Sequence, residues 1–216
     1  MKRYIHIAYT QLSDKLGRKS RVLWRNKKER SRLVNKNITI FSQNCIGGIM
    51  YHDLGLQFCS PTVNLIFTPS EFIRFMKDIH YYIEQDIQFI ATEESYPVAK
   101  LGEVEVRFFH YHSEEEARNA WNVRKSRINW KNVFVICCDD GLSYEEIVEF
   151  DNLPYENKIL FLHQDVRGIS CGIVAKEFTD KTDARLLNFA NPMGKRFYQN
   201  YIDYVTWLNG EKNYKI

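Results

Sequence analysis

The sequence predicts an α/β protein with a mainly parallel, Rossmann-like sheet in a three-layer sandwich. Beyond residue 37, short apolar blocks alternate with blocks that begin with helix-start signals, which is the pattern of repeated β-α units. The apolar run at 133–138 is typical of a strand covered on both faces. With 216 residues and 44% hydrophobic composition, the chain can bury one good core. The prediction is therefore a single α/β domain over 38–216, preceded by a basic helical N-terminal arm over 1–37.

Each predicted element follows from a local pattern. Thr68 and Pro69, a capping hydroxyl and an N1 proline, begin one helix, and serine followed by glutamates begins the helices at Ser113 and Ser143. The stretch 85–103 is the least regular, and it is either an active-site loop or a small antiparallel excursion. The predicted strands span 38–42, 63–67, 104–110, 133–138, 158–163 and 171–176. The predicted helices span about 47–55, 68–84, 113–127, 143–150 and 194–208.

Charge is unevenly distributed along the chain. The formal net charge is +3, yet residues 1–37 contain twelve Lys or Arg residues against Asp14 and Glu29. This arm also carries apolar residues at helical spacing, so it is either a solvated amphipathic helix pair or a segment that lies on an anionic membrane surface. Nucleic acid is not expected as a partner, because aromatic residues are not interleaved through the basic segment as base stacking requires. The oligomeric state is left undetermined.

Hydropathy and cysteine content restrict the location of the protein. No apolar run approaches the roughly 18 to 20 residues that a membrane-spanning helix needs, and residues 1–7 are too short and too polar for a secretion signal. The expected location is the cytoplasm, with the arm able to hold the protein at the inner face of the membrane. The five cysteines form no C-x-x-C pair, which argues against a disulfide framework and a zinc site. No metal site is predicted, and the cofactor is left undetermined.

The strand-to-helix turn after residue 42 is the first candidate site. In an open parallel sheet, ligands bind beyond the carboxyl ends of the strands, and Asn44, Cys45, Gly47 and Gly48 occupy such a position. The glycines either let helix amides approach an anionic group or only let helix and strand pack closely. Cys45 is either a nucleophile at a helix N-terminus or a small buried residue. The sequence does not show which histidine, if any, approaches it.

Polar residues elsewhere supply further candidates. Asp139 and Asp140 end the strand at 133–138, where they either hold a divalent metal that bridges a nucleotide diphosphate or only form a turn. Asp140, in a metal or base function, is one of the predicted catalytic residues. His163 ends the next strand and is either a general base or a histidine at a strand terminus. Arg124 and Arg127 lie on a predicted helix, where they either recognise phosphate or keep the surface soluble.

Three long stretches carry a family resemblance, and they read FSQNCIGGIMYHDLGLQFCSPTVNLIFTPSEFIRFM, YPVAKLGEVEVRFFHYHSEEEARNAWNVRKSRINWKNVFVI and FDNLPYENKILFLH. Together they resemble the bacterial family called domain of unknown function nineteen-nineteen, whose members are often labelled exopolysaccharide or capsule biosynthesis proteins. The resemblance covers roughly residues 25–175. Gln43 and Ile46 depart from the S-N-N-C-W-G-G form that many relatives show in the first motif.

The family motifs extend the set of candidate residues. Tyr51 and Ser60 match the first motif and join the ligand-binding candidates, while His110 and Arg124 match the second. The association with polysaccharide loci implies a substrate that is a sugar nucleotide or a lipid-linked glycan. It implies no particular reaction.

These observations lead to three functional hypotheses. The first is a transferase that moves a sugar, or a phosphate-containing group, from a nucleotide-activated donor to a growing surface polysaccharide, with His110, Asp140 and His163 in catalysis. The second is a non-catalytic module that binds a nucleotide sugar or glycan intermediate in an assembly complex. The third is cysteine-dependent acyl transfer or hydrolysis through Cys45. The sequence leaves open whether the protein is an enzyme.

Overall fold

A parallel sheet forms the centre of the protein. The computed structural model describes residues 14–176 and 186–216, so residues 1–13 of the predicted arm lie outside the described part. Within that part, the parallel sheet has four strands in the order β1-β5-β6-β7, and every neighbouring pair is parallel. The four strands are β1 (Thr39–Ser42), β5 (Val133–Cys138), β6 (Asn157–Leu162) and β7 (Gly172–Val174). The predicted α/β class and its parallel sheet are confirmed.

A small antiparallel sheet lies beside the parallel one. It has the order β2-β3-β4, with strands β2 (Gln88–Ile90), β3 (Val98–Leu101) and β4 (Val104–Arg107). Of the two interpretations of 85–103, the antiparallel excursion is therefore right. The strand predicted at 63–67 is wrong: the chain turns at Asn64, whose φ is 67°, and then makes only a bridge between Ile66 and Arg107.

The helices begin largely where the capping residues predicted. Thr68, Ser113 and Ser143 each accept a hydrogen bond from the backbone N–H three residues later, which satisfies a donor of the first turn. The predicted helix 68–84 is interrupted at Asp78, and the predicted closing helix is replaced by two short helical segments. The helices are α3 (Ile46–Leu54), α4 (Pro69–Lys77), α5 (Ile79–Glu84), α6 (Glu114–Lys125), α7 (Tyr144–Asp151), α8 (Tyr204–Leu208) and the 3-10 helix η3 (Phe197–Asn200).

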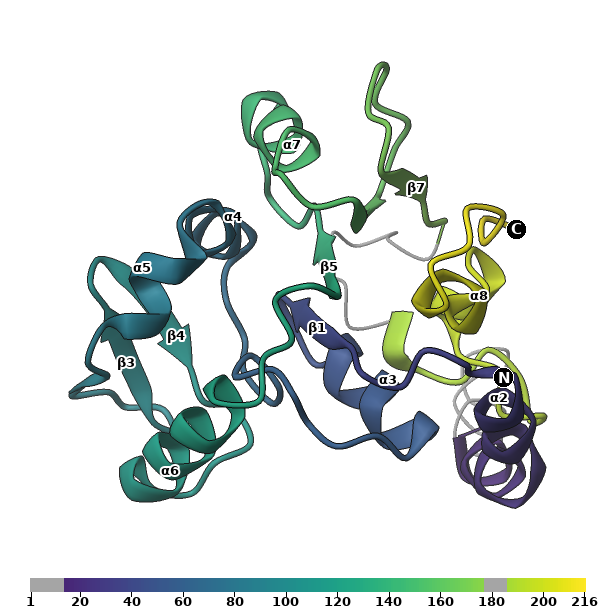
Figure 1. Ribbon diagram of the computed structural model, residues 1–216, viewed down its shortest axis with the longest axis horizontal. Coiled ribbons are helices and arrows are strands. Elements are labelled where there is room, and N and C mark those ends of the chain that lie inside the picture. The colour runs from purple at the N-terminus through teal and green to yellow at the C-terminus, as the bar shows by residue number, and fades with distance from the viewer. Residues whose placement is uncertain (1–13, 177–185) are drawn as a thin grey trace, which may run out of the picture.

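Both faces of the parallel sheet are buried. Successive residues of β5 alternate between two hydrophobic clusters: Val135 and Cys137 pack with residues of α4, α6 and α7, whereas Phe134 and Ile136 pack with residues of α3 and α8. Figure 1 shows α4 on one side of the sheet and α3 and α8 on the other. Because both faces are covered, the sheet is open to solutes only at its edges and at the ends of its strands. The more specific Rossmann-like sandwich stays a prediction.

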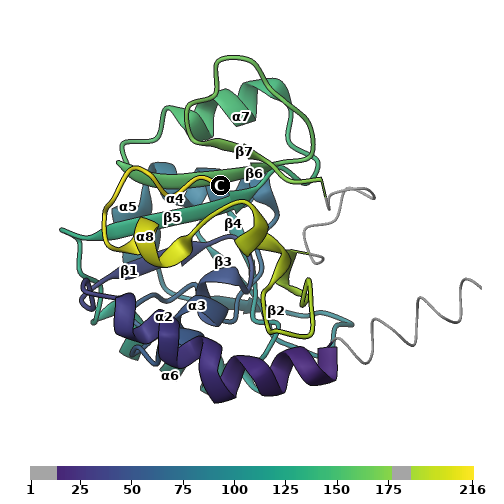
Figure 2. The ribbon, with the colours of Figure 1, turned by 90° about the vertical axis from the view of Figure 1, so that its right-hand side faces the viewer.

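The basic segment forms a helix that packs on this body. Residues 14–32 are helical throughout, with a π-helical section, η1 (Arg21–Arg25), before α2 (Asn26–Arg32). Figure 2 shows the helix running along one edge of the molecule. Over 14–32 the structure has one continuous helix and no helix pair. The domain boundary between residues 37 and 38 stays a prediction. No helix in the described ranges is long and apolar enough to cross a membrane.

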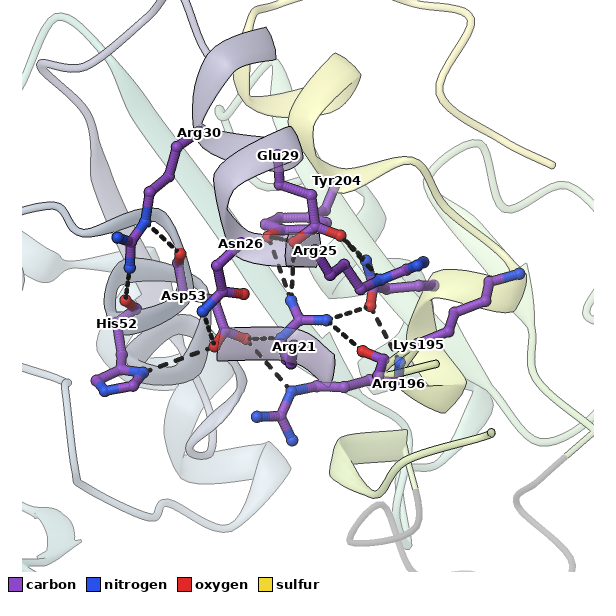
Figure 3. Close-up of polar contacts among 12 residues, drawn as sticks. Arg21, Arg25, Asn26, Glu29, Arg30, His52, Asp53, Lys195, Arg196 and Tyr204 are labelled. Carbon is purple, nitrogen blue, oxygen red and sulfur yellow. Dashed lines mark hydrogen bonds and ion pairs between the residues drawn. The ribbon is translucent and has the colours of Figure 1, made fainter. Parts of the chain in front are cut away.

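A buried arginine attaches this helix to the rest of the chain (Figure 3). Arg21 is only 2% exposed, and its Nε donates to Asp53 Oδ2 at 2.6 Å while its Nη2 donates to Glu29 Oε2 at 2.9 Å. Its Nη1 donates to Gly194 O at 2.7 Å and to Gln199 Oε1 at 2.8 Å. The network therefore joins the helix to α3 and to the C-terminal segment.

Candidate functional site

Polar side chains gather where the parallel strands end. Ser42 of β1 pairs with Ile136 of β5, and Cys138 of β5 pairs with Phe161 of β6, so the carboxyl ends of these strands lie side by side at one end of the sheet. Parallel α/β sheets bind ligands at this end, which is called the sheet edge below. Two side-chain pairs lie here, Cys45 with His110 and Asp139 with His163.

The first pair joins a thiol to an imidazole. Cys45 Sγ lies 3.4 Å from His110 Nε2. Cys45 is the N-cap residue of α3, but its side chain makes no capping bond, is half-buried, and belongs to neither hydrophobic cluster. A thiol at a helix N-terminus beside a histidine is the arrangement that produces a nucleophilic thiolate. The geometry allows the nucleophile interpretation, and the role of Cys45 stays a prediction.

His110 is held by the turn that contains it. The residues on either side of this turn, Phe108 and Tyr111, are buried, and Tyr111 N–H donates to Phe108 O at 3.0 Å. The Tyr111 hydroxyl donates to Val63 O at 3.2 Å and accepts a hydrogen bond from Arg124 Nη1. Arg124 also donates to Val63 O at 2.8 Å. These contacts of Arg124 fix the turn that presents His110, and its ligand-binding role stays a prediction.

The second pair joins a carboxylate to an imidazole. Asp139 is 1% exposed, and its Oδ2 lies 2.5 Å from His163 Nδ1 and accepts from His163 N–H at 3.1 Å. A carboxylate on Nδ1 leaves Nε2 as the ring atom that can accept a proton. His163 was predicted as a catalytic residue, and the structure supplies the carboxylate that orients it. That carboxylate belongs to Asp139, whereas the predicted catalytic residue Asp140 is exposed.

The glycines of the turn serve close packing. Ile46 N–H donates to Asn44 Oδ1 at 2.9 Å, and Gly47 N–H donates to Ser42 Oγ at 3.2 Å. A Cβ on Gly47 would lie 2.6 Å from Ser42 Oγ, and one on Gly48 would lie 3.3 Å from Val63 Cγ1. These contacts support the interpretation in which the glycines let helix and strand approach. They count against an anion held by the first amides of α3.

The remaining candidates make contacts inside the fold. The buried Tyr51 hydroxyl accepts from Ile40 N–H at 2.8 Å and donates to Ile38 O at 3.1 Å, and burial raises the pKa of this phenol. Ser60 is fully buried with its Oγ 3.0 Å from Thr62 Oγ1. Arg127 is exposed and donates to Phe58 O at 3.5 Å. The structure does not bring these three candidates to the Cys45 and His163 pairs, and their ligand-binding role stays a prediction.

Both pairs flank one stretch of the sheet edge. Neighbouring strands lie about 4.8 Å apart and β1, β5 and β6 are successive strands, so the strands that precede Cys45 and His163 lie about 10 Å apart. Asn44, which precedes Cys45, places its Nδ2 3.7 Å from Sγ of Cys138, which precedes Asp139. Among the described residues, no group of three His, Cys, Asp or Glu side chains is arranged to hold a metal ion.

The fold and the site define a class: an α/β protein whose parallel strands end at a cysteine–histidine pair and an aspartate–histidine pair. The chain belongs to the family described as "Domain of unknown function (DUF1919)", whose model matches residues 16–209. It is also 38% identical over 186 residues to an uncharacterized protein of Haemophilus influenzae, a match that covers 85% of this chain and 90% of that protein. The predicted family is confirmed, and the exopolysaccharide and capsule labels stay predictions.

Proposed function

We propose that the protein is a transferase that moves an acyl group through Cys45 to a hydroxyl acceptor. The observation that carries this proposal is the 3.4 Å contact between Cys45 Sγ and His110 Nε2 at the N-terminus of α3. Thiol nucleophiles with an adjacent base form covalent intermediates that divide acyl transfer into two easier steps. The third sequence hypothesis thereby takes precedence over nucleotide-sugar chemistry.

In the first step, Cys45 takes the acyl group from its donor. His110 Nε2 accepts the thiol proton, and the sulfur attacks the acyl carbonyl carbon. The bond between the carbonyl carbon and the leaving group then breaks, and His110 returns the proton to the leaving group. The product of this step is a thioester on Cys45.

In the second step, the Asp139–His163 pair prepares the acceptor. Asp139 holds Nδ1 of His163, so Nε2 accepts the proton of the acceptor hydroxyl. The hydroxyl oxygen attacks the thioester carbonyl, and the carbon–sulfur bond breaks to give an ester and the Cys45 thiolate. The proton on His163 then returns to the sulfur through solvent. We propose a surface-polysaccharide precursor as the acceptor, because the family resemblance in the sequence implies a link to polysaccharide loci.

Acetylation by p-nitrophenyl acetate tests the first step. We expect a burst of nitrophenol and a protein mass increased by one acetyl group, located on Cys45 by peptide mapping. Cys45→Ser should abolish the burst, and His110→Gln should slow it by about 10²–10⁴-fold, the usual contribution of a general base. Cys59→Ser is the matched control, because Cys59 is another half-buried free thiol and burial raises its pKa. A burst that survives in Cys45→Ser would falsify the proposal.

Asp139→Asn separates the two steps. The amide keeps the shape of the side chain but removes the negative charge beside His163 Nδ1. We expect unchanged acetylation of Cys45 and a transfer to a sugar hydroxyl that is slower by about 10²-fold. Equal transfer rates in the variant and the parent would remove His163 from the mechanism while leaving Cys45 in place.

A second candidate is glycosyl transfer from a nucleotide-activated donor in exopolysaccharide or capsule assembly. The Asp139–His163 pair supports it, because that reaction also needs a base for an acceptor hydroxyl at the sheet edge. A Rossmann-like arrangement would suit such a donor. The occupied amides of Ile46 and Gly47 count against a diphosphate at this turn.

A thermal-shift screen with uridine and guanosine diphosphate sugars, with and without magnesium or manganese, tests this candidate. Stabilisation with release of free nucleotide supports glycosyl transfer. Stabilisation without turnover supports the non-catalytic module that binds a nucleotide sugar or glycan intermediate. No stabilisation by any donor removes both.

A further inference from the structure

Three consecutive apolar side chains project outward from the helix at 14–32. Val22 is 61% exposed, Leu23 is 69% exposed and Trp24 is 39% exposed. They fall within η1, where the wider π-helical turn places Arg21 and Asn26 on the buried side, leaves Arg25 half-buried and puts the three apolar residues on the outer side. Leu16, two turns earlier, is 40% exposed. Contiguous apolar surface of this kind marks an interaction site.

Cations surround this apolar ridge. The helix carries exposed basic side chains that form no hydrogen bond or ion pair with the described residues, namely those of Lys15, Arg18, Lys19, Lys27 and Lys28. The carboxylate of Glu29 lies on the buried side with Arg21. The outer surface of the helix is therefore apolar at its centre and positive around it.

We propose that this surface docks on a bilayer that contains anionic phospholipid. An interfacial helix buries an apolar ridge at the level of the headgroups while its Lys and Arg side chains meet anionic lipid. A second copy of the chain is a poor occupant, since it would bring the same positive charges together. Nucleic acid leaves Val22 and Leu23 without an apolar partner. The proposal does not rest on the transferase chemistry.

A cavity beside the ridge fits a lipid headgroup. Its volume is about 240 Å³, and it is lined by Arg18, Arg21, Val22, His52, Asp53, Phe189 and Arg196. Arg18 and Val22 belong to the outer surface of the helix, so the cavity opens beside the apolar ridge. The negative charge of Asp53 is shared by Arg21 at 2.6 Å and Arg196 at 3.4 Å. Arg196 also donates from Nη1 to Leu187 O at 2.6 Å, so the guanidinium group of Arg18 is the one in this lining that remains to attract a phosphate.

Vesicle sedimentation of the full chain tests the proposal. We expect binding to vesicles of phosphatidylglycerol and phosphatidylcholine, and little binding to phosphatidylcholine alone. The double variant Val22→Ser, Leu23→Ser should bind at least about tenfold more weakly, because the buried apolar area is lost. Its matched control is Val123→Ser on α6, where the valine is 47% exposed. Both replacements are at exposed positions, so circular dichroism and the melting temperature should stay those of the parent.

Charge reversal supplies the second arm. Lys27→Glu with Lys28→Glu should reduce binding to the anionic vesicles by about tenfold or more, and added salt should weaken binding by the parent. Equal binding to neutral and anionic vesicles, or parent-like binding by the Val22, Leu23 variant, would overturn the proposal. Release of the protein from vesicles by duplex DNA or RNA would also overturn the proposal if the Val22, Leu23 variant bound nucleic acid as tightly as the parent.

Discussion

Replacing Arg21 by methionine should remove a large part of the stability of the fold. Arg21 is 2% exposed and lies between two carboxylates that are themselves nearly buried, Asp53 at 2% and Glu29 at 5% exposed. Methionine keeps much of the length and apolar volume of the side chain while it removes the charge. The substitution therefore isolates the electrostatic role of Arg21 within the network that Figure 3 shows.

The expected loss of unfolding free energy follows from the buried charges that remain when Arg21 is replaced. Arg21 donates hydrogen bonds of 2.6 to 2.9 Å to Asp53, Glu29, Gly194 and Gln199. Without it, each buried carboxylate keeps one more distant cation, Arg196 at 3.4 Å from Asp53 and Arg25 at 3.2 Å from Glu29. Glu29 also keeps its neutral hydrogen-bond donors, Tyr204 at 2.6 Å and Gln199 at 2.8 Å. Breaking a buried ion pair by removing one member costs about 3–5 kcal/mol. For a chain of this length each kcal/mol lowers the melting temperature by about 2–4 °C, so the expected fall is about 6–20 °C.

Urea unfolding measured by circular dichroism, together with a thermal melt, gives both quantities. Arg18→Met is the matched control, because Arg18 lies one turn earlier on the same helix with its side chain exposed. We expect a change of less than about 0.5 kcal/mol there. Arg21→Lys keeps the charge but loses the guanidinium fork, so its cost should fall between the two. A loss below about 1 kcal/mol in Arg21→Met would show that the carboxylates relax or take up protons, and would refute the reasoning from buried charge.

Two further predictions concern local packing and pH. Gly47→Ala should destabilise the fold by about 1–3 kcal/mol in urea unfolding, since the new Cβ would meet Ser42 Oγ at 2.6 Å, and an unchanged midpoint would contradict close packing there. Burial alone would raise the pKa of Asp151, but hydrogen bonds from Cys171 and Ser170 outweigh it and lower the pKa to about 2. The stability from this depressed pKa is present above the unfolded value of 3.8 and is lost as pH falls toward about 2; for a partly exposed carboxylate it is about 1 kcal/mol. The advantage of the parent over Asp151→Asn should therefore shrink between pH 5 and pH 2.5, and a constant difference would show that Asp151 has an ordinary pKa.

The parts of the fold that follow from local patterns were predictable. The run at 133–138 was correctly predicted as a strand covered on both faces, since it is apolar throughout. In the structure its alternate residues pack into two different hydrophobic clusters. Helix starts at Thr68, Ser113 and Ser143 were predictable because a capping hydroxyl acts within three residues. The strand predicted at 63–67 was wrong, since Asn64 has a φ of 67° and Leu65 N–H donates to Thr62 O at 3.2 Å within a turn that apolar composition does not reveal.

The candidate site was only partly predictable, because each of its pairs joins residues from different elements of the fold. Cys45 and His110 are 65 positions apart, and the antiparallel sheet that separates them in sequence brings them together in space. Asp139 and Asp140 are equivalent in the sequence. Which of the two carboxylates contacts His163 depends on a hydrogen bond from Asp139 N–H to Phe161 O, which keeps Asp139 beside the carboxyl end of β6.

The burial of Arg21 was likewise not predictable from the sequence. The count of basic residues in 1–37 correctly marked a positive segment, but it could not separate the buried arginine from the exposed ones. That separation depends on the π-helical turn and on Asp53, 32 positions away, and Gln199, 178 positions away. A local pattern predicts that a helix forms, whereas the identity of its buried charge is a property of the assembled fold.

Helix α3 relates the two proposed sites to each other. Cys45 precedes its first residue and Asp53, which lines the headgroup cavity, lies near its end, so a rise of 1.5 Å per residue places the two about 12 Å apart along the axis. The amides of Ile46 and Gly47 are satisfied by Asn44 and Ser42, and Gly47 holds the helix tightly on β1. With both proposals in place, a chain docked through the outer surface of helix 14–32 would hold the Cys45 thiol at a fixed and short distance from the headgroups. An acceptor carried on a lipid would then need only a polar head of a few sugar units to reach the sheet edge.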